Sequence, residues 1–314
     1  MILVTGATGL SGSIVVQEFA RQNVPVRALV RNPDKARKLH RLPRVEVVEG
    51  DMLRPETLTA ALRGVERVLL ISSERERMPE TQCTFIDAAK AAGVPHIVKY
   101  SSRESGVGFD IDSFTRTREH RDIERHLEAS GLAWTHLRPS QFMEVYLPGT
   151  LTGVDPRRRE LRIPIGDSRL SPVAIEDVAK VAVALMTSDG HEGRAYDMTG
   201  PEALTMKEVV ERISEATGTA FRHVELSPED KLRESAEAGI PEPTIRILRE
   251  LFAERRRRPE SHVLLDTHRT FGVRPTSFAE FARRHAEAFL ADAAPTSAPG
   301  GREAPWDAHG NRWW

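Results

Sequence analysis

The sequence predicts an α/β fold: a doubly wound parallel Rossmann sheet with a smaller, mostly helical C-terminal substrate region. The first reason is the start of the chain, where the apolar run 2–4 leads into the turn Gly6-Ala7-Thr8-Gly9-Leu10-Ser11-Gly12. The second is the helical spacing of apolar residues directly after this turn, from Ile14 to Ala20. The third is the alternation of short apolar runs with helical patterns up to about residue 140, which is typical of a parallel sheet.

The elements of this first part follow from the apolar runs and from the residues that bound them. Pro55 suits the first turn of a helix, and Gly93 and Gly131 end two helical patterns. The expected strands are 2–4, 24–30, 45–48, 67–72, 96–102 and 134–139. Besides the helix after the glycine turn, the expected helices are 33–42, 55–62, 79–92 and 116–130.

Beyond residue 140 the pattern loosens. A helix is expected at 176–186 and a further strand of the sheet at 195–198, whereas 149–166 has no clear periodicity. Thr205 caps a helix that reaches residue 217, with Glu208 as its capping-box partner. A short strand at 222–226 and helices at 228–239, 241–256 and 278–290 follow. The expected units are a Rossmann domain (1–140 with 172–200), a substrate-binding region (141–171 with 201–290) and a tail (291–314).

Composition narrows the class of protein. The 314 residues are 39% hydrophobic and 29% charged with a net charge of −1, which is typical of a soluble globular protein and gives no reason to expect nucleic acid or a membrane as a partner. Cys83 is the single cysteine, so an intrachain disulfide is excluded and a reducing compartment is favoured. The first strand begins at once and no apolar run is long enough to span a membrane, so a cytoplasmic location is expected. No metal site is expected, and the oligomeric state stays open.

The glycine-spaced turn is the expected cofactor site. Gly6 permits the tight turn, Gly9 lets the backbone approach a pyrophosphate, and Gly12 lets the helix pack closely on the strand. Free N–H groups at the helix start face the anion. The residues expected to hold the pyrophosphate are Gly6, Thr8, Gly9, Leu10, Ser11 and Gly12.

The end of the second strand indicates which nucleotide is bound. An acidic residue there selects NAD, whereas an arginine accommodates the 2′-phosphate of NADP. The residue here is Arg31, so NADP(H) is the expected cofactor, unless Arg31 is an ordinary solvated charge. Asp51 and Met52 follow the third strand, where a carboxylate meets the adenine edge or caps the next turn. Ser72 and Ser73 end the fourth strand beside the cofactor groove, or are turn residues.

Several motifs together resemble the NmrA-like family of atypical short-chain dehydrogenases/reductases. They are the segments 4–9, 28–31, 50–51, 130–139 and 196–201, and the similarity extends to about residue 290. The family includes NADPH-dependent quinone, azo-dye and triphenylmethane reductases. It also includes redox-sensing regulators that bind the nucleotide without turning it over. The resemblance implies that the nicotinamide lies after the sixth strand, where Pro139 and Phe142 either wall the ring or belong to the core.

The superfamily's usual catalytic pair, Tyr-x-x-x-Lys, is absent. Its positions hold Arg116 and His120, and no tyrosine lies between Tyr100 and Tyr146. An unperturbed imidazole titrates near neutral pH, so His120 is expected to donate a proton or to bind the ribose. The alternative is that His120 packs beside the cofactor for shape alone. Ser102 is placed to hydrogen-bond a substrate carbonyl. Tyr146 is either a replacement acid or a buried packing residue.

We therefore predict an NADPH-dependent reductase that transfers hydride to a quinone or a polycyclic or aromatic ketone, a small-molecule aromatic substrate. An electron-poor quinone accepts hydride without a strong acid because its developing oxyanion is delocalised. The alternative is an NADP(H)-sensing, non-catalytic regulator that binds a protein partner, which the missing catalytic pair keeps open.

Overall fold

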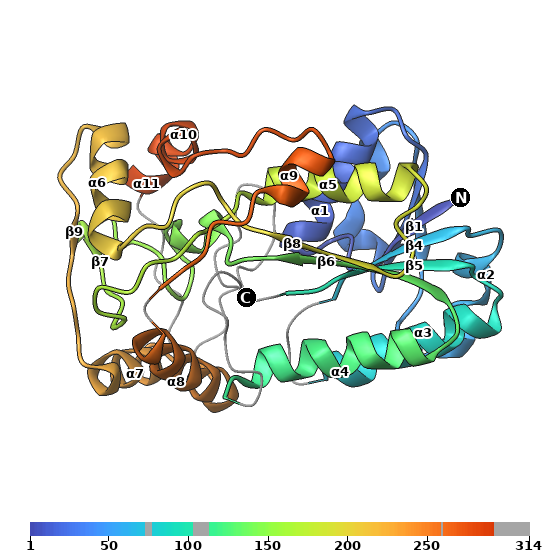
Figure 1. Cartoon of the computed structure of the whole chain (residues 1–314), viewed down its shortest axis with the longest axis horizontal. Coiled ribbons are helices and arrows are strands. Elements are labelled where there is room, and N and C mark those ends of the chain that lie inside the picture. Colours follow the sequence, from blue (N-terminus) through green and yellow to red (C-terminus); the bar gives the residue numbers. More distant parts are fainter. Residues whose placement is uncertain (73–76, 103–112, 259, 292–314) are drawn as a thin grey trace.

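A computed structural model of the chain describes residues 1–72, 77–102, 113–258 and 260–291 (Figure 1). Its centre is a seven-stranded sheet in the order β3-β2-β1-β4-β5-β6-β8, with every neighbouring pair parallel. This order confirms the doubly wound parallel sheet. The strands are β1 (Ile2–Val4), β2 (Val26–Val30), β3 (Val45–Glu49), β4 (Arg67–Leu70), β5 (His96–Tyr100), β6 (Ala133–Pro139) and β8 (Arg194–Met198).

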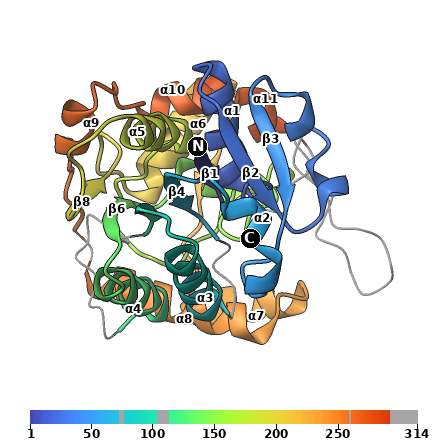
Figure 2. The ribbon, with the colours of Figure 1, turned by 90° about the vertical axis from the view of Figure 1, so that its right-hand side faces the viewer.

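Helices cover both faces of the sheet, because successive apolar side chains of a strand point to opposite faces and both faces must be buried. α1 (Leu10–Arg21) and α5 (Ile175–Thr187) lie on one face, and α3 (Met78–Ala91) and α4 (Thr115–Ala129) lie on the other (Figure 2). On β5, Val98 belongs to the hydrophobic cluster of α1 and α5, whereas Ile97 belongs to the cluster of α3 and α4. Strands buried on both faces read as continuous apolar runs, which is why the sequence revealed them.

The C-terminal part forms a core of its own. In Figure 1 it lies to the left, at the end of the sheet away from the N-terminus. Phe252, Phe278, Phe281 and Phe289 are among its buried residues. Its elements are α6 (Met206–Thr217), α7 (Pro228–Glu237), α8 (Glu242–Arg257), α10 (Phe278–Arg284), α11 (Ala286–Leu290) and a parallel pair of short strands, β7 (Glu160–Leu161) and β9 (Arg222–His223). The capping box at the start of α6 is confirmed: Thr205 N donates to Glu208 Oε2 at 2.8 Å, and Glu208 N donates to Thr205 Oγ1 at 3.2 Å.

Some predicted elements need correction. The predicted helix at 33–42 is two 3-10 helices, Pro33–Ala36 and Leu39–Arg41. The buried residues Ala36 and Leu39 are three positions apart, which matches three residues per turn. The predicted helix at 278–290 is divided into α10 and α11 at His285, whose backbone leaves the helical region (φ −109°, ψ 16°).

Other short elements were not predicted, or their boundaries differ. The segment 55–62 is a 3-10 helix, Pro55–Thr57, followed by α2 (Thr59–Leu62). Strand β7, the 3-10 helix Met143–Tyr146 and α9 (Asp266–Thr270), which packs against β8, were not predicted. Each is too short to show a period and depends on a distant partner, as β7 depends on β9. Apart from residue 291, the predicted tail lies outside the described residues. A search of the described ranges finds no helix long and apolar enough to cross a bilayer.

Candidate functional site

The glycine turn connects β1 to α1 at the carboxyl end of the sheet. Gly6 has φ +60°, and a Cβ there would lie 2.7 Å from the carbonyl oxygen of Ile71, at the end of β4. A Cβ on Gly12 would lie 2.2 Å from the carbonyl oxygen of Gly6, so only glycine lets α1 approach the turn this closely. These two glycines are therefore required by the packing of the chain itself.

Gly9 differs from the other two glycines. Its φ is −78°, and the nearest atom to an added Cβ is the Gly6 carbonyl oxygen at 3.2 Å, so the fold alone would tolerate a side chain after a small adjustment. The Gly9 N–H donates to Gly6 O at 2.9 Å, and Ser13 N–H donates to Gly9 O at 2.9 Å. A glycine that packing does not demand, at the start of a 12-residue helix, suits close approach of a pyrophosphate.

Thr5 holds the turn against β4, a role that sequence reasoning missed. Its buried hydroxyl donates to Ile71 O at 2.6 Å and accepts from Ile71 N at 2.8 Å. The two hydrogen bonds fix the end of β1 to the end of β4. The backbone N–H groups of Thr8, Leu10 and Ser11 therefore sit on a rigid support, as a preorganised anion site requires.

The residues predicted to contact the nucleotide follow the neighbouring strands. Arg31 comes directly after β2; its side chain is exposed and makes no hydrogen bond or ion pair with any other described residue. Asp51 Oδ1 accepts from Leu53 N at 3.0 Å, so this carboxylate does cap its own turn. Met52 is buried in the cluster of α3 and α4, and Ser72 Oγ accepts from Gln82 Nε2 at 2.8 Å. Ser73 lies outside the described residues.

His120 projects from α4 toward the end of β5, where it meets a buried lysine. Lys99 Nζ lies 3.0 Å from His120 Nδ1; Lys99 is fully buried and His120 is 4% exposed. Lys99 is a residue that sequence reasoning missed. The signal was a charged residue inside an otherwise apolar central strand, because lysine is almost never fully buried unless it is paired.

A second pair orients α4 against the sheet. Arg138 on β6 binds the carboxylate of Glu124 with Nε at 2.9 Å and Nη2 at 2.7 Å. Burial acts to raise the pKa of Glu124, but the hydrogen bonds and charge of Arg138 outweigh it and bring the pKa to about 2. Because His120 lies four residues before Glu124, this clamp also fixes the helix face that carries the imidazole. Arg116, one turn earlier, forms an ion pair with Glu119 at 2.7 Å.

The segments after β5 and β6 carry the remaining predicted site residues. Ser102 is half-buried and follows Ser101, whose N–H donates to Leu137 O at 2.8 Å. Pro139 is the last residue of β6, and the half-buried ring of Phe142 lies 6.4 Å from that of Tyr100. Both segments therefore end at the same edge of the sheet as the glycine turn.

Tyr146 lies in the core of the C-terminal part. It is fully buried, its ring packs edge-on against Phe278 at 5.5 Å, and its hydroxyl accepts from Gln141 Nε2 at 3.0 Å. Enclosure by apolar neighbours supports the packing role of Tyr146 over the proton-donor role. The structure brings His120 next to a second ionisable group, Lys99.

Glu144 is a buried carboxyl that sequence reasoning also missed. Its Oε1 accepts from the N–H of Ile175, the first residue of α5, at 3.0 Å. Burial raises the pKa of Glu144 to about 8, and the nearby charges of Glu176 and Asp177 act in the same direction. The hydrogen bond joins the segment after β6 to a helix of the Rossmann part, so the protonation of Glu144 bears on how the two parts are held.

Comparison with known proteins identifies the part of the chain that contains the glycine turn as NAD(P)H-binding. A family model described as NAD(P)H-binding matches residues 6–189. The chain is 36% identical over 293 residues to the NAD(P)H azoreductase of Xenophilus azovorans, covering 92% of this chain and 99% of the relative. It is 37% identical over 294 residues to the (4-alkanoyl-5-oxo-2,5-dihydrofuran-3-yl)methyl phosphate reductase of Streptomyces griseus, covering 92% and 99%.

A solved structure shows the same arrangement. The NADPH-dependent quinone oxidoreductase of Escherichia coli, in its complex with NADPH, superposes with a TM-score of 0.79 at 28% identity. The superposition covers 90% of this chain and 99% of that one. The similarity therefore extends over the Rossmann sheet and the C-terminal part together.

Proposed function

This chain belongs to the NAD(P)H-binding family, among its NmrA-like reductases, and from that premise we propose that it transfers hydride to a quinone or to a polycyclic or aromatic ketone. It is an NAD(P)H-dependent oxidoreductase with NADP(H) as its cofactor. The observation that carries the proposed chemistry is the buried contact between Lys99 and His120 at the end of β5.

The residues of the glycine turn suit the cofactor. The missing side chain at Gly9 suits close approach of a pyrophosphate, whereas Gly6 and Gly12 keep the turn tight. The exposed Arg31 is placed after β2, where a cation meets a 2′-phosphate. When bound, NADPH supplies the hydride, and the chain itself has to bind, orient and protonate the acceptor.

The Lys99–His120 contact supplies a route for the proton. With Lys99 in its ammonium form, which has no acceptor, Nζ donates to Nδ1 and a neutral imidazole carries its proton on Nε2. His120 gives this proton to the oxyanion that forms on the acceptor, and Lys99 returns a proton to Nδ1. Ser102, at the same strand end, donates a hydrogen bond to the same oxygen. In this proposal His120 and Lys99 together replace the proton-donating tyrosine that the chain lacks.

The acceptor class follows from the weakness of this acid. A neutral imidazole is a poorer proton donor than an imidazolium, so the oxyanion must already be stabilised when it forms. Quinones and conjugated ketones delocalise that charge, whereas a simple aliphatic ketone concentrates it on one oxygen. The relatives named for azo, quinone and conjugated lactone substrates support this choice.

The test is NADPH consumption against a panel of quinones, azo dyes and polycyclic ketones. We expect turnover with at least one of them, and His120→Ala should slow it by about a hundredfold or more, the low end for loss of an acid–base group. His126→Ala is the matched control, because His126 lies on the same helix and faces Asp87. An equal rate in His120→Ala would contradict the assigned donor. No turnover with any acceptor, while NADPH still binds, would favour the nucleotide-sensing regulator.

Arg31→Ala should lower NADPH affinity about tenfold to a hundredfold, because a charge-assisted hydrogen bond contributes about 1.5–3 kcal/mol. NADH, which lacks the 2′-phosphate, should bind the variant and the wild type alike. Calorimetric titration with both nucleotides measures this, and Arg246→Ala, an exposed arginine of α8, is the control. A variant that still prefers NADPH to the wild-type extent would remove Arg31 from the site.

A further inference from the structure

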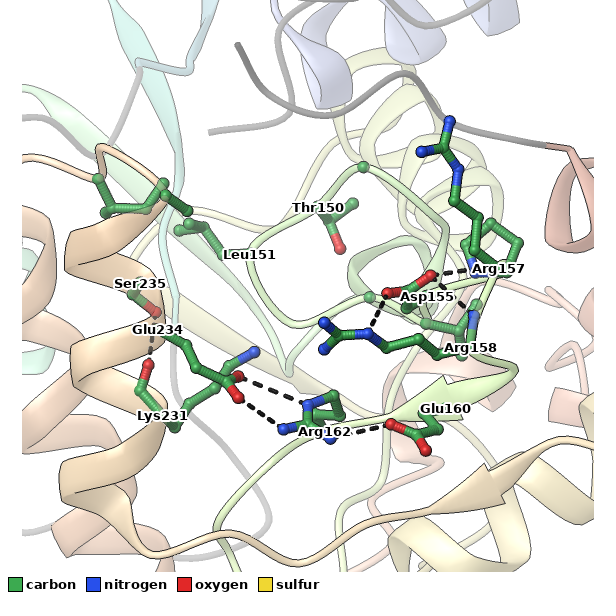
Figure 3. Close-up of a pocket in the computed structure, with 16 residues that line it drawn as sticks. Thr150, Leu151, Asp155, Arg157, Arg158, Glu160, Arg162, Lys231, Glu234 and Ser235 are labelled. Atoms are coloured by element: carbon green, nitrogen blue, oxygen red, sulfur yellow. Dashed lines mark hydrogen bonds and ion pairs between the residues drawn. The ribbon is translucent and has the colours of Figure 1, made fainter. Parts of the chain in front are cut away.

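A cavity of about 340 Å³ lies within the C-terminal part, between the loop 149–162 and α7 (Figure 3). None of its lining residues belongs to the glycine turn, to β5 or to α4. Its volume is at the lower end of the range of small-molecule pockets. Leu151, Val154 and Ile240 give it an apolar wall, and four cationic side chains with three carboxylates give it a charged one.

Two of the three carboxylates are already neutralised within the wall. Arg162 bridges them, with Nη1 2.9 Å from Glu160 Oε2 and Nη2 2.5 Å from Glu234 Oε1. Glu160 also binds Arg222 Nη2 at 2.6 Å. Arg162 is therefore fully engaged, and neither glutamate is left to attract a cation.

The third carboxylate, Asp155, shapes the loop. Its Oδ1 accepts from the backbone N–H groups of Arg157 at 2.9 Å and Arg158 at 3.2 Å. The side chain of Arg158 lies farther away, with Nε 3.7 Å from Asp155 Oδ2. Figure 3 shows the Arg158 guanidinium reaching into the cavity from the loop, opposite α7. Because that ion pair is long and exposed, it leaves Arg158 available to a ligand.

Lys231 completes the cationic side from α7 and points into the cavity (Figure 3). Glu234, one turn further along the helix, is its natural partner, but the Glu234 carboxylate is held by Arg162. The half-buried Lys231 ammonium makes no hydrogen bond or ion pair with any described side chain. Burial lowers the pKa of Lys231 and outweighs the nearby charge of Glu234, which acts to raise it, while the charges of Arg162 and Arg158 act in the same direction as burial. An anion in the cavity would offset both effects.

We propose that this cavity binds a small organic anion, with its carboxylate or phosphate group against Lys231 and Arg158 and its apolar body along Leu151, Val154 and Ile240. The charges of the wall favour a negatively charged ligand. Its carboxylates are already held by Arg162 or by backbone N–H groups, whereas the positive charge of Lys231 has no such partner among the described residues. The apolar wall selects against a bare inorganic ion. This site goes beyond the proposed reduction, and its occupancy is measured without any turnover.

The test is calorimetric titration of the full chain with hexanoate, hexyl phosphate and hexanol. We expect one or both anions to bind while hexanol does not, and the stronger of the two identifies the group that the cavity takes. Lys231→Met should lower the affinity for the anion about tenfold or more, because a charge-assisted hydrogen bond is lost. Lys207→Met is the control, because Lys207 on α6 pairs with Asp167 outside the cavity.

Arg158→Gln is the second variant, because Arg158 is exposed and its loss should leave the fold intact. It should also weaken anion binding, with unchanged thermal unfolding of the unliganded protein. Failure of both anions to bind the wild type at millimolar concentration would overturn the proposal. Equal affinity in the wild type and both variants would overturn it as well, and neither result would bear on NADPH oxidation.

Discussion

Gly12→Ala should lose NADPH binding and much of the stability of the fold. The added Cβ would lie 2.2 Å from Gly6 O, 2.8 Å from Gly6 C and 3.1 Å from Ala7 Cα, all of them backbone atoms. A backbone that is itself held by Thr5 and Ile71 cannot move away cheaply. We expect a destabilisation of about 3 kcal/mol, the upper end for overpacking. Urea unfolding and calorimetric titration with NADPH measure the two losses.

Gly9→Ala is the matched variant that separates packing from binding. Its Cβ would meet only Gly6 O, at 3.2 Å, which asks for a shift of far smaller size than in Gly12→Ala, so the unliganded protein should lose much less stability than Gly12→Ala does. We propose that the pyrophosphate approaches at this Cβ position, so NADPH affinity should fall by tenfold or more, about 1.4 kcal/mol or above. Wild-type affinity in Gly9→Ala would place the nucleotide elsewhere. Wild-type stability in Gly12→Ala would show that α1 does not pack on the turn in this way.

Glu144→Gln should remove a loss of stability that the wild type undergoes as the pH rises from about 4.5 to about 8. The pKa of Glu144 is raised from 4.5 to about 8 in the folded chain. Between these values the folded state binds more protons than the unfolded state, so the free energy of unfolding falls as the pH rises. The loss begins above pH about 4.5 and is complete above pH about 8, and it is on the order of several kcal/mol. The glutamine keeps an oxygen for the Ile175 N–H and carries no charge.

Thermal unfolding from pH 6 to pH 9 measures this effect. The melting temperature of the wild type should fall by roughly 5–10 °C more than that of Glu144→Gln over this range, since each kcal/mol corresponds to about 2–4 °C in a chain of this size. Glu211→Gln, an exposed glutamate of α6, should follow the wild type at every pH. Parallel curves for the wild type and Glu144→Gln would mean that Glu144 is already ionised, or solvated, in the folded state.

Much of the fold was predictable because it depends on the spacing of apolar residues that are close together in the sequence. Strands buried on both faces are apolar runs, and a helix that covers them repeats its apolar residues every three or four positions. The glycine turn and the place of Arg31 follow from the same local order, since each directly succeeds a strand. The predicted helix at 33–42 failed for a local reason as well: its apolar residues repeat every third position, and the 3-10 and α periods differ little over so short a segment.

What the sequence by itself determined is therefore the sheet, the glycine turn and the positions of the strand ends, because each depends on residues that are neighbours along the chain. The tertiary structure alone decided which ionisable side chains meet. Lys99 and His120 come from a strand and a helix 21 residues apart, and Glu144 reaches Ile175 across 31 residues. The cavity beside Lys231 joins a loop to a helix that begins at Pro228. No local period encodes such contacts, since they depend on how the packed elements bring distant positions to within hydrogen-bond distance.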